Sequence, residues 1–121
     1  MMTTFRYAFS GMVLGLMSLT ASGQQLLPNP GFSDGNVAPI GWTLQGSGEW
    51  LDRGVLQVAG DGQNSSAWRC SLDLEPGALY RFQCVARREG SGGGCMITGP
   101  EFANRDQQPS EVWRSYGHVF Q

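Results

Sequence analysis

The sequence predicts an all-β protein, an antiparallel β-sandwich made of short strands. Two observations carry this prediction. Apolar and polar residues alternate over residues 68–74 and again over 80–88, which is the period of a half-buried strand. In addition, no segment of about ten residues shows helical periodicity, and turn-forming glycine and proline recur along the chain.

The two alternating stretches are expected to form a hairpin. Pro76-Gly77 separates them, because proline presets φ for a turn and glycine supplies the positive φ that can follow. The simplest register places Cys70 opposite Cys84, with both thiols on one face. Two alternatives stay open for this pair, a disulfide or two small buried apolar side chains, and Cys95 remains single in either case.

Residues 1–23 are expected to lie outside the fold, as an export signal peptide. Arg6 precedes an apolar run over residues 8–19, and small residues up to Gly23 suit cleavage after that glycine. The run has about twelve residues, and a membrane-spanning helix needs about twenty. We therefore expect a secreted or periplasmic mature domain, residues 24–121, without a membrane span.

The remaining strands are expected at regular intervals along this domain. Residues 26–35 contain two prolines and two glycines, which excludes a helix and favours an extended entry followed by a turn. The further strand candidates, in chain order, are residues 41–44, 49–51, 55–59, 95–98 and 112–120.

Composition excludes several classes of function. The chain of 121 residues has eight basic and ten acidic residues, so a mildly acidic charge of −2 argues against nucleic acid as a partner. All eight basic residues are arginine, which rules out Schiff-base chemistry on lysine. The single histidine, His118, has no visible catalytic partner, and neither a nucleophile elbow nor zinc-ligand spacing is present. We therefore expect a protein that is not an enzyme.

Several short motifs together resemble a known family, the jelly-roll carbohydrate-binding modules of the galactose-binding-domain-like group. In chain order the motifs are Asn29-Pro30-Gly31-Phe32, Gly41-Trp42, Leu74-Glu75-Pro76-Gly77, Tyr80-Arg81-Phe82, and Trp113 with Phe120. The resemblance implies two packed antiparallel sheets and non-catalytic binding of an oligo- or polysaccharide. Such modules usually accompany a secreted glycoside hydrolase, so a linked hydrolase domain is a candidate partner.

The sequence departs from this family at two points. Many members place an acidic residue directly after the opening Phe, where it helps to hold a structural calcium ion; here Ser33 takes that position and Asp34 follows. Calcium therefore remains an alternative that rests on Asp34, and no other cofactor is expected. The family also continues with further strands beyond the one that ends near Phe120, so we expect the C-terminal strands of the sandwich to be missing.

The expected ligand-binding residues are aromatic and polar side chains at the surface. Aromatic rings stack on the apolar C–H faces of sugars, while polar side chains bind the hydroxyl groups. Trp50, which lies among acidic and glycine residues, is the first candidate, and Tyr116 and Arg81 are the second. Trp42 and Trp68 are expected in the core. The alternative function is an extracellular or cell-surface module that binds protein.

Overall fold

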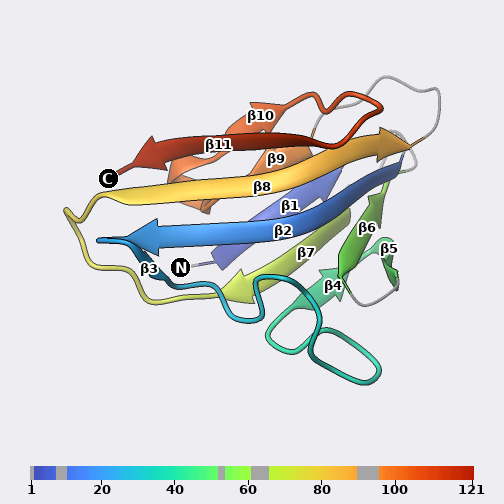
Figure 1. Ribbon diagram of the computed structural model, residues 1–121, viewed down its shortest axis with the longest axis horizontal. Coiled ribbons are helices and arrows are strands. Elements are labelled where there is room, and N and C mark those ends of the chain that lie inside the picture. The colour runs from blue at the N-terminus through green and yellow to red at the C-terminus, as the bar shows by residue number, and fades with distance from the viewer. Residues whose placement is uncertain (1, 8–10, 52–53, 61–65, 90–95) are drawn as a thin grey trace.

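The structure is a computed structural model that describes residues 2–7, 11–51, 54–60, 66–89 and 96–121. It is all-β, with two antiparallel sheets packed face to face (Figure 1). The five-stranded sheet has the order β10-β9-β1-β7-β4, and the six-stranded sheet has the order β11-β8-β2-β6-β5 with β3 paired to β2. Among the described residues, no helix has the length and hydropathy that crossing a membrane requires.

From residue 41 onward, most strands lie within a few residues of their expected positions, but β7 ends at Ser71 instead of Leu74 and β10 was not expected. The strands are β1 (Met2–Tyr7), β2 (Gly11–Ala21), β3 (Gln24–Gln25), β4 (Thr43–Gln45), β5 (Ser47–Leu51), β6 (Val55–Ala59), β7 (Ser66–Ser71), β8 (Tyr80–Glu89), β9 (Met96–Thr98), β10 (Arg105–Gln107) and β11 (Arg114–Phe120). A short 3-10 helix, η1 (Glu101–Ala103), connects β9 to β10. The predicted antiparallel β-sandwich is thus confirmed as an architecture.

The segment expected to lie outside the fold forms the middle strand of each sheet. β1 lies between β9 and β7, and β2 lies between β8 and β6. This placement differs from the expected domain boundary at residue 23. The physical reason lies in the apolar run itself, because β2 buries Met12, Val13 and Leu14 in succession and therefore contains the kind of continuous apolar stretch that is also typical of an export signal.

The alternation of buried and outward-facing side chains along β2 shifts once, between Leu14 and Met17. Met12, Leu14, Met17 and Leu19 are all fully buried in the core cluster between the sheets. The register with β8 shifts between Leu14 and Met17, as at a β-bulge, so residues three apart face the same side. Val13 is also fully buried but stands outside the core cluster, which places it under the outward face of the six-stranded sheet.

The predicted hairpin of residues 68–88 is wrong. β7 pairs with β1 and β4, whereas β8 pairs with β2 and β11, so the two strands belong to different sheets. Residues 72–79 cross from one sheet to the other. The turn itself is confirmed, because the Ala78 N–H donates to the Glu75 carbonyl over 3.3 Å and Gly77 has a φ of 82°. Alternation identifies a strand and its buried face, but it carries no information about the strand's neighbours.

The core joins the two sheets through tryptophan as well as aliphatic side chains. Trp42 and Trp68 are 4% and 3% exposed, which confirms their predicted core positions. Trp68 lies on β7 and its indole N–H donates to the Gln57 carbonyl of β6 in the other sheet, over 2.8 Å. The Trp42 ring meets Phe32 edge-on at 5.4 Å and its N–H donates to the Pro28 carbonyl. These bonds satisfy the polar atom of each buried indole.

Candidate functional site

The structure does not bring the three predicted ligand-binding residues together. Trp50 lies on β5 at one edge of the six-stranded sheet, and Tyr116 lies on β11 at the other edge. Three strands separate them (Figure 1). Arg81 is exposed on β8 and is paired with Val119, whereas Tyr116 is paired with the buried Cys84, so Arg81 and Tyr116 face opposite sides of the sheet. No single ligand of ordinary size contacts all three.

Trp50 is turned toward the core. It is paired with the fully buried Leu56, it is half-buried, and it packs against the core cluster. Its indole N–H donates to the Phe32 carbonyl over 2.8 Å. These contacts give Trp50 a structural role in attaching the edge strand to the opening loop.

Tyr116 is likewise held by the fold. It is half-buried, packs against the core cluster, and its hydroxyl accepts a hydrogen bond from the Ser110 N–H at 3.1 Å. Arg81, by contrast, is exposed on the outward face. Of the three predicted residues, only Arg81 is therefore exposed.

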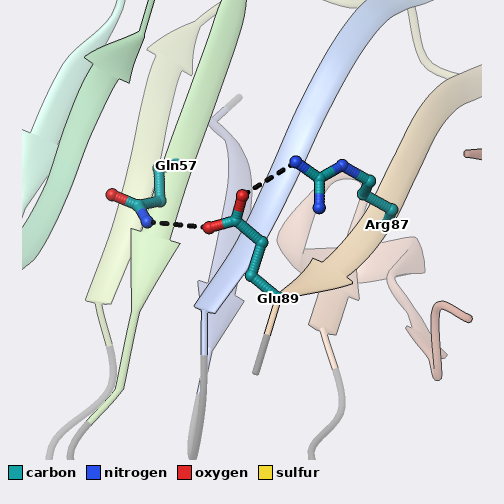
Figure 2. Close-up of polar contacts among 3 residues, drawn as sticks. All are labelled: Gln57, Arg87 and Glu89. Atoms are coloured by element: carbon teal, nitrogen blue, oxygen red, sulfur yellow. Dashed lines mark hydrogen bonds and ion pairs between the residues drawn. The ribbon is translucent and has the colours of Figure 1, made fainter. Parts of the chain in front are cut away.

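A different group of side chains forms a row on the outward face of the six-stranded sheet. Glu89 accepts a hydrogen bond from Arg87 Nη2 at 2.8 Å through Oε1, and one from Gln57 Nε2 at 3.3 Å through Oε2. Figure 2 shows the Glu89 carboxylate between the two, with Arg87 coming from β8 and Gln57 from β6. The row spans β2, because Val13 is paired with both Arg87 and Gln57. These side chains therefore cover the buried Val13, and their polar groups remain partly exposed.

Trp113 extends this row with an exposed aromatic ring. The Arg87 guanidinium carbon lies 5.3 Å from the centre of the Trp113 ring, within the range of a cation–π contact. Gly15 lies next to the ring, where a Cβ would be in ordinary van der Waals contact with Trp113 Cζ3 at 3.6 Å and with Val85 Cβ at 3.8 Å. Trp113 is 43% exposed, whereas Trp42 and Trp68 are buried. We name Trp113, Arg87, Glu89 and Gln57 the outward row.

The charges of the outward row are balanced within it. The side chains of Arg87 and Glu89 are 32% and 34% exposed and form an ion pair at 2.8 Å. A half-exposed pair of this kind contributes little to stability, on the order of 1 kcal/mol or less. Its effect is geometric, because it fixes the direction of one carboxylate and one guanidinium beside the ring. The arrangement places the flat apolar face of Trp113 next to planar hydrogen-bonding groups. The ion pair leaves the outward row without a strong net charge.

The opening loop holds Asp34 by its backbone. The Asn29 side-chain oxygen accepts from the N–H groups of Ser33 and Asp34 at 3.1 Å each, and its amide donates to the Asp34 carbonyl at 2.8 Å. Within the described residues, no three His, Cys, Asp or Glu side chains cluster as metal ligands. Calcium takes about six to eight oxygens, so Asp34 alone does not fit a calcium site.

Both described cysteines lie in the core. Cys70 and Cys84 are 3% and 2% exposed and lie on different sheets, which overturns the expected cross-strand register but confirms their predicted burial. Burial raises the pKa of the Cys84 thiol from 9.0 to about 12. Cys95 lies outside the described residues.

We expect Cys84 to be unreactive toward thiol reagents at pH 8 in the native state, because the reactive thiolate is almost absent there. Labelling followed by mass spectrometry of peptides should show modification of Cys84 only after unfolding in urea. The unfolded sample is the control. Since the folded pKa is raised, the stability that the buried thiol contributes is fully present below pH 9 and falls as the pH rises toward about 12. Rapid native labelling of Cys84 would contradict this placement.

Comparison with known proteins does not assign the chain to a family. The chain matches no protein-family model, no curated protein and no solved structure. The class that the fold itself defines is an antiparallel β-sandwich with an outward row of aromatic and polar side chains.

Proposed function

We propose that this protein is a non-catalytic saccharide-binding module and that the outward row is its binding surface. The observation that carries the proposal is the exposed Trp113 ring beside the hydrogen-bonded Arg87, Glu89 and Gln57 side chains. Sugars combine apolar C–H faces with hydroxyl groups, and this surface combines an aromatic face with fixed donors and acceptors. The motif resemblance to jelly-roll carbohydrate-binding modules points to the same class of ligand.

The ligand that fits this surface is a neutral oligo- or polysaccharide. Arg87 and Glu89 neutralise each other, so the row offers no uncompensated cation for a sulfated or uronic-acid chain. Binding by one ring and a few hydroxyl contacts is expected to be moderate, with a Kd of roughly 1 μM to 1 mM.

Trp113→Ala is expected to weaken saccharide binding by roughly 10- to 100-fold, because it removes the stacking face. Because the ring is 43% exposed, the substitution should lower the free energy of unfolding by only about 1 kcal/mol. Affinity electrophoresis against a panel of soluble glycans identifies the ligand, and titration calorimetry then measures the loss.

The matched control is Phe102→Ala. Phe102 is a 63% exposed aromatic residue on η1 that contacts Phe120 instead of the outward row. Its removal should leave saccharide affinity unchanged. Equal losses in Trp113→Ala and Phe102→Ala, or no binding by the folded protein to any glycan, would refute the proposal.

The second candidate is an extracellular module that binds protein, and one observation favours it. Leu16 and Val119 are 61% and 46% exposed, and Val119 faces the same outward side as Arg81. Exposed aliphatic side chains of this kind are more typical of protein contacts than of sugar contacts. A folded protein that binds no glycan, and in which Leu16→Asp abolishes capture of a protein partner, would support this alternative.

Export is the remaining part of the proposal. The Arg6-led apolar segment over residues 8–19 has the pattern of an export signal and supports a secreted or periplasmic location. The resemblance to carbohydrate-binding modules supports a role as an accessory to a glycoside hydrolase. N-terminal sequencing of the extracellular form should return Gln24, and a start at Met1 or Met2 would contradict processing. Processing of this kind is compatible with the fold only if the cut piece stays bound as the middle strand of each sheet, so a stable, folded protein that has lost residues 1–23 would contradict the position of β2.

A further inference from the structure

A short exposed turn joins the two middle strands to the rest of the chain. Ser22 and Gly23, with φ values of 52° and 78°, connect β2 to β3 and are exposed. Below the turn, the Gln25 side-chain oxygen accepts hydrogen bonds from the N–H groups of Leu19 at 2.9 Å and of Leu26 and Leu27 at 3.1 Å. The turn is therefore accessible, while the strands on either side of it are fixed by contacts of their own.

The strands that precede this turn are held from both sides. β1 is paired with β7 along its length, from Met2↔Ser71 to Tyr7↔Ser66, and also with β9. β2 is paired with β8 from Gly11↔Glu89 to Thr20↔Arg81, and with β6. Neither set of hydrogen bonds depends on the covalent link through Ser22 and Gly23.

We propose that residues 1–23 are a separable strand element and that residues 24–121 are its acceptor. Hydrolysis of the Gly23–Gln24 amide by a peptidase adds water across one exposed bond, leaving a carboxylate on Gly23 and an amine on Gln24. The N-terminal piece then stays in place as the middle strand of both sheets. The acceptor holds this piece as an extended apolar strand.

Two physical effects favour retention of the cut piece. The backbone ladders supply hydrogen bonds on both edges of each middle strand, which is the basis of recognition by strand addition. The core face of β2 supplies specificity, because Met12, Leu14, Met17 and Leu19 are fully buried and their loss would open the centre of the core. The proposal does not rest on saccharide binding, and its test has no saccharide readout.

The test uses the full chain with a recognition sequence for a specific protease inserted between Ser22 and Gly23. After cleavage, size-exclusion chromatography and native mass spectrometry should find both pieces in one species at the elution volume of the uncut protein. Urea should separate the pieces, and a synthetic peptide of residues 1–23 should restore the species when it is mixed with residues 24–121 during dilution from urea.

Two neighbouring substitutions in the peptide provide the matched comparison. Met17→Asp puts a carboxylate on a fully buried position, whereas Leu16→Asp puts the same group on a 61% exposed position. Met17→Asp should weaken recovery of the complex by about a hundredfold or more, and Leu16→Asp should leave it within a few-fold.

Three results would overturn the proposal. One is separation of the pieces in buffer with residues 24–121 remaining a folded monomer. Another is equal recovery with Met17→Asp and Leu16→Asp. The last is a requirement for denaturant before the protease cuts, because the exposed turn would then be protected in the native protein.

Discussion

Removal of residues 1–23 is expected to abolish the cooperative fold. The deletion removes the middle strand of each sheet and leaves β10-β9, β7-β4, β11-β8 and β6-β5 as separate pairs. An isolated two-stranded pair is marginal in water, and its open edges promote aggregation. We expect residues 24–121 to melt without a cooperative transition and to elute as aggregates.

The size of this effect follows from burial alone. Five side chains of β2 are 0% exposed, namely Met12, Val13, Leu14, Met17 and Leu19. Burying such a side chain contributes about 1.5–3 kcal/mol, and the net stability of a domain is about 5–15 kcal/mol. Deleting these five side chains therefore removes a stabilising free energy comparable to the net stability of the whole domain. Full-length protein in the same buffer is the control, and a monomeric, cooperatively melting 24–121 fragment would refute the assignment of β2.

Trp42→Ala is expected to lower the free energy of unfolding by a large fraction of its total. Trp42 is 4% exposed, packs edge-on against Phe32, and donates its indole N–H to the Pro28 carbonyl at 3.0 Å. Emptying this position should cost about 3–5 kcal/mol for the cavity, and the loss of the hydrogen bond adds about 1 kcal/mol. Urea unfolding monitored by circular dichroism measures the difference.

Trp50→Ala is the comparison for Trp42→Ala. Trp50 is half-buried at an edge strand, and its indole N–H also binds a loop carbonyl. We expect its replacement to cost about 2–3 kcal/mol, less than Trp42→Ala because less area is lost. A larger loss for Trp50→Ala would mean that the edge strand, and not the opening loop, anchors the core.

Several strands after residue 40 could be predicted because their periodicity is local. β6 matches its expected bounds, and the alternation of β8 places Tyr80, Phe82, Cys84 and Ala86 on the buried face. β10 was not expected, because Arg105–Gln107 is polar throughout and reads as a loop. The arrangement of the strands could not be predicted, because neighbours such as β1 and β7 are far apart in the sequence and their pairing is set by the sandwich as a whole.

The outward row could not be predicted from the sequence for the same reason. Gln57 and Glu89 are far apart in the chain and meet only because β2 lies between β6 and β8. Trp113 has no local pattern that distinguishes it from Trp50, because an isolated tryptophan beside polar residues suits either a surface or an edge position.

The position of β2 is the central claim, and nuclear magnetic resonance of the full-length protein tests it most directly. Cross-strand nuclear Overhauser effects should connect Leu14 to Ala86 on one side and to Leu56 on the other, and they should connect Met17 to Cys84. Chemical shifts over residues 11–21 should be those of a strand. Helical shifts over this segment, with none of these contacts, would contradict the account.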